Sequence, residues 1–415
     1  MTTNNQPTRW VMIGLGFTAT VINYLDRQTL SVAAPVLIVR YHMSAVAYSW
    51  IIFAFMLAYT VMNPIWGQII DRLGTRVGYA LSTALWSAAA VAHAFILGPV
   101  SLGLCRFLLG IGEAGNWPAG VKVAAEWFSA KERTLATGIF NSGSAFGAVF
   151  APPLIVWIVL KFGWRAAFAF VGATGFVWLT GWICIYYSPA VAVAAKATRP
   201  MPPWRLLRVR FVWSFTLSKA FMDPAWYFYV FWFPEYLKRA RHFDLASIGR
   251  YAWIPFLGAG IGNFVGGWLC GAVLKWGVGL TVARKGTLSL FALLMTCAIP
   301  AALVSNPFVS LAFVSVAMFG YNGCAAIMLA FPADLFRADK VASVFGMAAL
   351  GSGFGGMVSA PLAGWVIEHY SFLPAFFVFG LIPLASISIV WTLIGPLEPP
   401  IDIEAFSACF ATPKK

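Results

Sequence analysis

Long apolar runs without a single charged residue constrain this chain more than any other feature. Two of them, at 49–65 and 381–394, contain no Asp, Glu, Lys or Arg. Over all 415 residues 60% are hydrophobic and only 10% are charged, and the mean hydropathy is +0.80. Because a soluble domain carries about 25% charged residues, these values exclude a soluble enzyme, a disordered chain and a nucleic-acid-binding module. The runs lack the polar–apolar alternation of a membrane β-barrel, so we expect an all-α integral membrane protein.

The apolar runs also predict the number of membrane spans. A helix needs about 20 residues to cross a bilayer, and the chain is long enough for about a dozen such helices. Charges, prolines and glycines divide the runs into spans at 10–34, 48–70, 78–97, 99–124, 134–160, 165–188, 211–236, 247–271, 286–305, 307–331, 342–368 and 372–395. The first run holds charges and has no cleavage-site pattern, so we expect it to remain as a span.

Basic residues are distributed unevenly between the expected loops. If the N-terminus is cytoplasmic, 17 Lys and Arg residues fall on the cytoplasmic side and 7 on the other side. Because basic loops stay in the cytoplasm, we expect both termini there, in a multi-pass protein of the inner or plasma membrane. The same asymmetry explains the net charge of +14 without nucleic acid as a partner.

A basic, proline-bearing stretch near the midpoint divides the chain into two related halves. An offset of 208 residues aligns Gly143, Ser144, Phe146, Gly147 and Pro153 with Gly351, Ser352, Phe354, Gly355 and Pro361. Two six-helix repeats with a substrate between them are the plan of a transporter. We therefore expect an N-terminal bundle at 1–188, a basic cytoplasmic linker at 189–210, a C-terminal bundle at 211–395 and a cytoplasmic tail at 396–415.

Charged residues inside two spans of the first half form the main candidate site. The first span contains Asp26 and Arg27, and the fourth contains Arg106 and Glu113, which are seven residues apart and share one helical face. If the first span ends near residue 34, Asp26 and Arg27 lie at the depth of Arg106, and Glu113 lies about two turns deeper. Buried ion pairs add little stability, which favours a functional cluster over a static set of salt bridges.

The seventh span carries a second charged pair. Lys219 and Asp223 are four residues apart and therefore on one helical face. A simple ion pair within the helix explains them equally well. Tyr24, Tyr59 and Trp226 are candidates to line a sugar cavity, although aromatic residues make up 16% of the chain and more often serve as packing or interfacial anchors.

One motif in the fourth span is misleading. Residues 110–115, Gly-Ile-Gly-Glu-Ala-Gly, match the dinucleotide-binding pattern G-x-G-x-x-G, but no strand precedes them. Glycines within a membrane helix instead predict close helix–helix contact. The sequence also contains no Walker A motif, which argues against ATP-driven transport. We therefore expect neither enzymatic activity nor a cofactor nor a metal.

The loop between the second and third spans resembles the signature loop of the major facilitator superfamily. It contains Gly67, Asp71, Arg72 and Arg76 at the spacing typical of that loop. We expect this segment to act as a gating loop. Asp71 is expected to pair with a neighbouring helix end or arginine, and Gly67 to let two backbones approach closely.

Other segments resemble the anion:cation symporter family within that superfamily. They are Asn-Tyr-Leu-Asp-Arg at 23–27, the segment 106–118 that contains the glycine motif, and Glu-Trp-Phe-Ser-Ala-Lys-Glu-Arg at 126–133. Residues 223–226 and 231–234 resemble the hexuronate transporter branch of the family. The resemblance implies proton-coupled uptake of a sugar acid such as glucuronate, galacturonate or a related aldonate.

The same resemblance implies individual roles. Asp26 and Glu113 match proton-binding carboxylates, Arg27 and Arg106 match basic residues that meet the substrate carboxylate or pair with those acids, and Tyr59 matches a cavity-facing position. Export or exchange of an organic anion remains the alternative, and a membrane sensor without transport is more remote, since only about twenty residues follow the last span. We expect a small anion and protons as partners, the lipid bilayer as surroundings, and a monomer as the functional unit.

Overall fold

The computed structural model describes residues 6–128, 130–187, 209–335 and 338–397, and within these ranges the regular structure is entirely helical. The first half contains α1 (Gln6–Arg40), α2 (Ala45–Leu73), α3 (Thr75–Ala92), the short 3₁₀ helix η1 (His93–Phe95), α4 (Pro99–Glu113), α5 (Asn116–Trp127), α6 (Ala130–Phe162) and α7 (Trp164–Ile185). The second half contains α10 (Arg210–Arg241), α11 (Leu245–Tyr251), α12 (Ile254–Lys275), α13 (Leu280–Met295), α14 (Ala298–Leu303), α15 (Pro307–Leu335), α16 (Ala338–His369) and α17 (Phe372–Thr392).

The predicted all-helical membrane fold is confirmed, and each of the twelve expected spans falls on one of these helices or on two joined by a short break. Short breaks separate α4 from α5, α11 from α12, and α13 from α14. Eight segments of the described chain are long and apolar enough to cross a membrane by themselves. Among the helices that are not included are α1, α4 and α10, which contain the charged candidates that lie inside expected spans.

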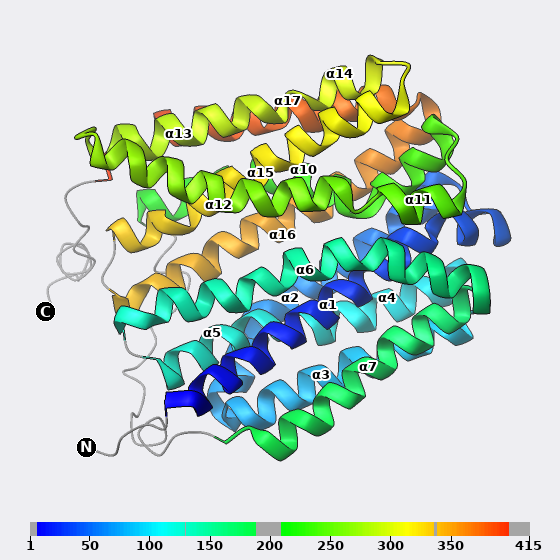
Figure 1. Ribbon diagram of the computed structural model, residues 1–415, viewed down its shortest axis with the longest axis horizontal. Helices are drawn as coiled ribbons and strands as arrows, with labels where there is room; N and C mark the ends of the chain where they lie inside the picture. The colour runs from blue at the N-terminus through cyan, green and yellow to red at the C-terminus, as the bar shows by residue number, and fades with distance from the viewer. Residues whose placement is uncertain (1–5, 129, 188–208, 336–337, 398–415) are drawn as a thin grey trace, which may run out of the picture.

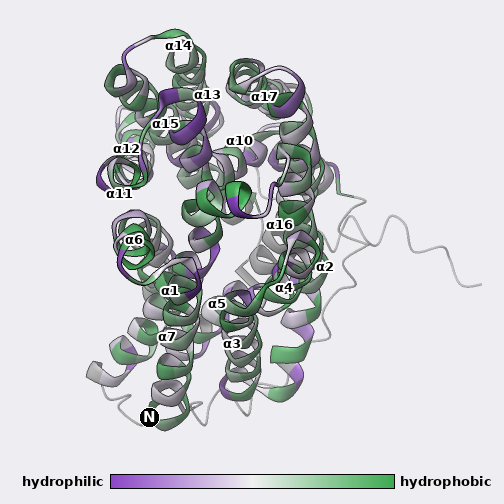
Figure 2. Ribbon diagram, turned by 90° about the vertical axis from the view of Figure 1, so that its right-hand side faces the viewer, coloured by the Kyte–Doolittle hydropathy of each residue, from purple (hydrophilic) through white to green (hydrophobic). Residues whose placement is uncertain are grey.

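The helices lie side by side in two groups. The first half, α1–α7, forms one group and the second half, α10–α17, forms the other, with α1 beginning and α17 ending at the same end of the molecule (Figure 1). Viewed along the helices, α16 of the second group lies next to α2 of the first (Figure 2). Most of the expected linker at 189–210 and of the tail at 396–415 lies outside the described residues.

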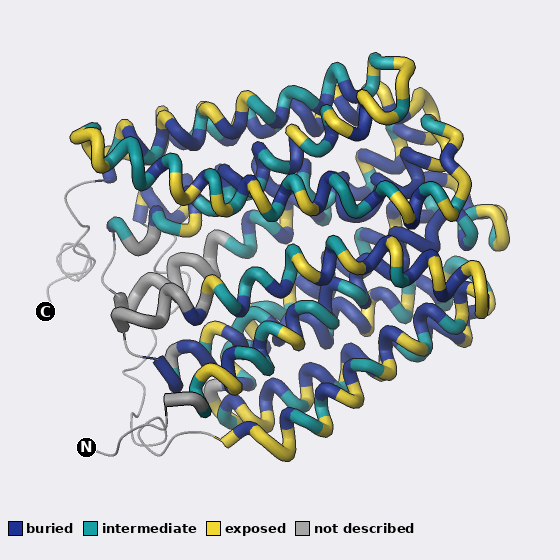
Figure 3. Tube along the Cα trace, in the orientation of Figure 1, coloured by how far each residue is buried: buried dark blue, intermediate teal, exposed yellow. Residues whose placement is uncertain are grey.

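Burial follows the pattern expected of helices surrounded by lipid. Buried residues line the faces between helices, while exposed ones follow the outward faces (Figure 3). Many of the outward residues are large and apolar, such as Phe264, Trp268 and Val177, which are 70–79% exposed. A water-soluble protein rarely exposes so much apolar surface, whereas lipid chains cover it.

Small residues at equivalent positions build the two groups in the same way. An added Cβ on Gly143 would lie 2.5 Å from the carbonyl oxygen of Phe17 in α1, and one on Gly351 would lie 2.0 Å from that of Thr216 in α10. Gly147 and Gly355, one turn further on, approach α1 and α10 in the same way. The fifth span thus packs on the first as the eleventh packs on the seventh.

The glycines of the misleading motif serve the same purpose. A Cβ on Gly110 would lie 2.5 Å from the backbone of Phe55 in α2, and a Cβ on Gly112 would lie 2.5 Å from that of Trp86 in α3. The helix α4 is therefore pressed between α2 and α3. This contact confirms the interpretation of the motif as a helix-packing element.

The two groups meet at one end of the molecule, which we call the closed end and define by the loops at 41–44, 242–244 and 370–371. The backbone carbonyl of Phe231 in α10 accepts hydrogen bonds from the hydroxyl of Tyr48 at 3.1 Å and from that of Ser31 at 3.4 Å. The carboxylate of Glu368 in α16 accepts the backbone N–H of Val46 in α2 at 2.7 Å. These bonds join the first half to the second.

Candidate functional site

The charged candidates of α1 and α4 lie together, but they pair differently from the simplest expectation. Glu113 accepts two hydrogen bonds from Arg27, from Nε at 3.1 Å and from Nη2 at 2.9 Å, both on Oε2. Both side chains are almost fully buried. Asp26, the neighbour of Arg27 in sequence, pairs with neither arginine among the described residues.

The depth of this pair corrects the prediction from the sequence. The expected end of the first span was residue 34, but α1 continues to Arg40 with Pro35 inside it. Arg27 therefore lies thirteen residues from the end of α1, and Glu113 lies fourteen residues after Pro99, the start of the antiparallel α4. At 1.5 Å per residue Arg27 is level with Glu113 and about 9 Å deeper than expected, so it is not level with Arg106.

Three aromatic rings surround the guanidinium of Arg27. Its central carbon lies 5.1 Å from the ring centre of Tyr24, 5.2 Å from that of Phe55 and 4.9 Å from that of Tyr59. Such cation–π contacts are strongest where water is excluded. They hold Arg27 in place, so that a change in Glu113 need not displace it.

Arg106 is the least satisfied group of the site. Its side chain is 1% exposed, and none of its three guanidinium nitrogens has a hydrogen-bond partner among the described residues. Its guanidinium carbon lies 5.9 Å from the ring centre of Phe55. One oxygen of Asp26 and the second oxygen of Glu113 are likewise buried and unpartnered. Because buried polar groups are normally hydrogen-bonded, these unpartnered atoms, and above all the three nitrogens of Arg106, mark a place for a ligand.

The second half contributes a neutralised cluster. Lys219 Nζ lies 2.7 Å from one oxygen of Asp223 and 3.0 Å from the other, so the ion pair that we kept as an alternative is present. The phenol of Tyr321 in α15 donates a further hydrogen bond to Asp223 at 3.0 Å. The ring of Tyr321 stacks on Trp226 with 5.1 Å between centres and an interplanar angle of 12°.

The two halves place unlike groups at equivalent positions. Tyr321 stands 208 residues after Glu113, and Trp226 stands 199 residues after Arg27, the same offset that separates Thr216 from Phe17 at the equivalent glycine contacts. The ion pair of the first half is thus replaced by an aromatic stack in the second. One side of the site is charged and the other is aromatic and neutral.

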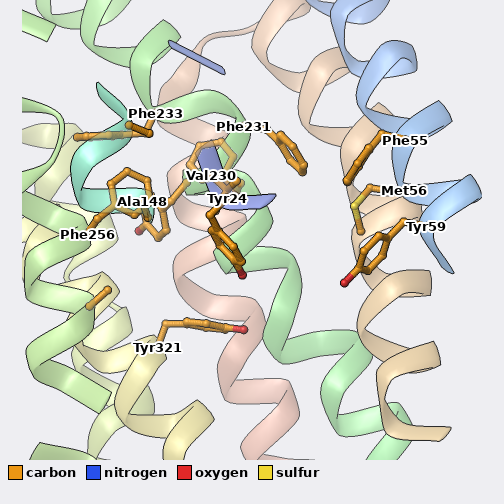
Figure 4. Packing of buried hydrophobic residues seen from close by; sticks show 14 of the residues in the cluster. Tyr24, Phe55, Met56, Tyr59, Ala148, Val230, Phe231, Phe233, Phe256 and Tyr321 are labelled. Carbon is orange, nitrogen blue, oxygen red and sulfur yellow. The ribbon is translucent and has the colours of Figure 1, made fainter. Parts of the chain in front are cut away.

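Phenol groups from both halves converge. The hydroxyl groups of Tyr24, Tyr59 and Tyr321 point toward the same space between the helices (Figure 4). Tyr227 adds a fourth phenol, which shares a 3.2 Å hydrogen bond with Ser352. Phenols donate and accept hydrogen bonds while their rings remain apolar, which suits the hydroxyl groups of a polyol.

Sequence reasoning missed several members of the site. Asn23 and Gln28 in α1 are fully buried, and neither amide has a partner among the described residues. Asn23 lies one helical turn before Arg27, so the i, i+4 spacing could have identified it. Tyr321 could have been found only by applying the repeat offset to Glu113 and asking what α10 places beside it.

The residues of the expected gating loop have different surroundings in the structure. Arg76 donates from Nη2 to the carbonyl of Ile183 at 2.6 Å, which ties α3 to the end of α7, and Arg72 is exposed. The side chain of Asp71 lies outside the described part of the structure. Among the described residues an added Cβ on Gly67 would meet nothing within 4 Å, so the close approach expected there stays a prediction.

The close backbone approach near this loop occurs on the next helix. A Cβ on Gly78 of α3 would lie 2.9 Å from the Cα of Ile70. Gly74, between α2 and α3, has φ +84°, a conformation that favours glycine. Gly74 and Gly78 are therefore the glycines that allow the tight turn between α2 and α3.

No group of three or more metal-binding side chains lies together in the part of the chain that the structure describes. The chemistry available at the site is instead electrostatic. Arg27 and Arg106 offer planar donors to a carboxylate, while Glu113 and Asp26 offer carboxylates that can take up protons. The arrangement can bind an anion and exchange protons next to it.

Comparisons with known proteins agree with this arrangement. Residues 16–283 match the family model described as Major Facilitator Superfamily. The chain is 33% identical over 414 residues to the hexuronate transporter of Escherichia coli K12, covering 95% of this chain and 96% of that protein. It is 36% identical over 336 residues to the galacturonate transporter of Dickeya chrysanthemi, covering 76% of this chain and 97% of the relative.

A solved structure shares the fold. A bacterial homologue of the human lysosomal transporter Spinster, crystallised in an inward-facing and unoccupied conformation, superposes with a TM-score of 0.70 at 18% identity, over 94% of this chain and 95% of the other. Together the family match, the relatives and the helical architecture show that this chain is a multi-pass membrane transporter and not an enzyme, and that it belongs to the major facilitator superfamily.

Proposed function

We propose that the protein is a proton-coupled symporter that imports a sugar acid, with a hexuronate such as glucuronate or galacturonate as substrate. The hexuronate and galacturonate transporters that it resembles over most of its length support the substrate class. The buried guanidinium of Arg106, which has no hydrogen-bond partner among the described residues, is the observation that carries the proposal. A buried cation without a partner is costly, and a substrate carboxylate would supply that partner.

Substrate binding begins with the carboxylate. Arg106 would hold it through two parallel hydrogen bonds, a geometry that guanidinium and carboxylate groups share. Arg27 would contribute as a second positive group once Glu113 releases it. Tyr24 and Tyr59, which flank Arg27, would bind the sugar hydroxyls, together with Lys219, Asp223 and Trp226 of the second half.

Proton coupling would use the two carboxylates of the first half. A proton on Glu113 removes the charge that holds Arg27 and leaves both arginines free for the substrate. Asp26, buried and without a described partner on Oδ2, would take the second proton. Release of the substrate would then accompany loss of the protons, because the ionised acids reclaim the positive charge.

The proposal includes an orientation. Both termini would lie in the cytoplasm, so that the closed end faces outward and the described contacts between the halves seal the site from outside. The bundles at 1–188 and 211–395 would rock about the site as a single chain. Asp71, Arg72 and Arg76 would act at the cytoplasmic gate, where Arg76 already links α3 to α7.

Uptake of labelled glucuronate into proteoliposomes tests the function. With an acidic outside, the purified protein should concentrate the label above the external level, and a protonophore should abolish the accumulation. Counterflow without any effect of the proton gradient would instead establish the alternative, an anion exchanger. No saturable uptake of glucuronate or galacturonate would contradict the proposal.

A further inference from the structure

We infer that Lys219, Asp223 and Tyr321 form the subsite for the uncharged end of the sugar acid, and that Asp223 makes the transporter reject a second carboxylate by neutralising Lys219. The inference rests on the proposed function and adds a rule of selection to it. Monocarboxylates such as hexuronates would be accepted. Dicarboxylic sugar acids, which carry a carboxylate at each end, would be excluded.

The first argument for the inference is that the two halves differ in the charge they offer to a carboxylate. In the first half, the buried guanidinium of Arg106 has no hydrogen-bond partner among the described residues, and so can receive one carboxylate. In the second half, Lys219 is paired, since both oxygens of Asp223 lie within 3.0 Å of its ammonium group. A second carboxylate would therefore meet a neutral pair with a negatively charged member.

The second argument is the burial of Asp223 and the fixed positions of its two hydrogen-bond donors. Its side chain is 4% exposed and that of Lys219 is 13% exposed, so water screens the pair only weakly. Asp223 also accepts the phenol of Tyr321, which leaves the carboxylate with two donors fixed in place. Replacing either donor by a substrate anion would bring two negative charges together inside the membrane, where the repulsion is large.

Trp226 is a positioning residue in this subsite. Its ring stacks on Tyr321 with 5.1 Å between centres and meets Phe256 edge-on at 6.0 Å. The ring of Tyr321 is thus held between helices, with its hydroxyl on Asp223 and directed toward the phenols of Tyr24 and Tyr59 (Figure 4). Hydroxyl groups of a sugar can join this network without adding a charge.

The test compares two acids that differ by one carboxylate. Glucuronate and glucarate share the configuration of their four inner carbons, and glucarate carries a second carboxylate at the carbon that is the aldehyde of open-chain glucuronate and closes its pyranose ring; open-chain gluconate, with one carboxylate, is included to separate the effect of the ring from that of the charge. Each unlabelled acid competes with labelled glucuronate for uptake by the wild-type protein. We expect half-maximal inhibition to need at least about ten times more glucarate than glucuronate. Equal competition by the two acids would overturn the inference.

Substitutions then locate the selection. Asp223→Asn keeps the shape but frees the charge of Lys219, so the ratio of the two inhibitory concentrations should fall about tenfold. The double variant Lys219→Gln with Asp223→Asn has neither charge and serves as the matched control, in which the ratio should not fall. An unchanged ratio in Asp223→Asn would contradict the inference.

A third variant covers the case in which Asp223→Asn does not fold. Lys219→Gln leaves Asp223 as an unneutralised anion, so glucarate should compete at least about threefold less well than with the wild type. A ratio equal to the wild-type value would overturn the inference. Failure of the wild-type protein to take up glucuronate at all is a separate outcome, which contradicts the proposed function.

Discussion

At the scale of single residues, two buried arginines in the same half have opposite surroundings. Arg27 has a carboxylate partner and three aromatic rings around it. Arg106 has no hydrogen-bond partner among the described residues, although it is buried even more deeply. Removing one buried partner costs about 3–5 kcal/mol when the other charge is stranded. The two arginines should therefore respond differently to the same substitution.

We predict that Arg27→Met lowers the free energy of unfolding by about 3 kcal/mol, because it strands Glu113. Arg106→Met breaks no described hydrogen bond, so its cost should stay below about 1 kcal/mol. Both variants should lose glucuronate uptake. Thermal unfolding in detergent measures the first effect and proteoliposome uptake the second. Equal destabilisation by the two substitutions, or saturable uptake by either, would contradict these assignments.

At the scale of helices, the main difference from the sequence prediction is the length of α1. Pro35 suggested that the first span ends near residue 34, because proline lacks the N–H that a helix interior needs. In membrane helices neighbouring groups can satisfy the freed carbonyl, and α1 continues to Arg40. This one change moves Arg27 to the level of Glu113 and decides which acid it meets.

The same element shows what the sequence could and could not predict. The pair Lys219–Asp223 follows from helical spacing alone, since its members are four residues apart. The pair Arg27–Glu113 joins residues 86 positions apart, and helical periodicity did not indicate whether Asp26 or Glu113 would face Arg27. Contacts between helices depend on how each helix is rotated and how deep it lies, which one sequence does not reveal.

A contact between helices at the closed end yields a second prediction. Glu368 of α16 accepts the backbone N–H of Val46 in the first turn of α2, where a negative charge is favourable. Glu368→Gln should weaken this link and populate conformations in which the closed end opens. Spin labels at positions 42 and 370, in a background without the native cysteines, should show a longer distance component. Ser371→Ala, which removes a cap of α17 at the same end, is the control and should leave the distances unchanged.

An exposed cap at the same end yields a prediction on pH. The hydroxyl and the amide of Ser247 lower the pKa of Asp244, the N-cap of α11. The cap is therefore fully formed above the ordinary carboxyl pKa of about 4 and is lost as the pH falls through the lowered value. Protection of the amides at 245–251, taken relative to the intrinsic exchange rate at each pH, should fall under acid, and Asp244→Leu should show the same loss of protection at neutral pH. Exchange in the variant equal to that of the wild type would contradict the assignment.

At the scale of the whole molecule, two halves of similar construction carry unlike chemistry. The equivalent glycine contacts on α1 and α10 show the common construction. The ion pair Arg27–Glu113 and the stack Trp226–Tyr321 occupy related positions. A symmetric scaffold with an asymmetric site can hold an elongated substrate in one orientation, with its charged end toward the first half.

The orientation in the membrane can be tested by labelling. In intact cells, an impermeant thiol reagent should modify His242→Cys, in a loop of the closed end, and should not modify Trp276→Cys, after α12. Both positions are exposed in the structure, so a difference in labelling reports the side of the membrane. Modification of Trp276→Cys from outside would reverse the proposed topology.

Coupling of protons to the substrate is the central claim, and Glu113→Gln tests it most directly. Glutamine mimics the protonated acid, so Arg27 stays available to the substrate while no proton can be released. In proteoliposomes the variant should exchange labelled for unlabelled glucuronate at equal pH, yet fail to concentrate it under an inward proton gradient. Asp26→Asn is expected to lose accumulation as well. If Glu113→Gln still concentrates glucuronate as the wild-type protein does, Glu113 does not couple transport to protons and the account is contradicted.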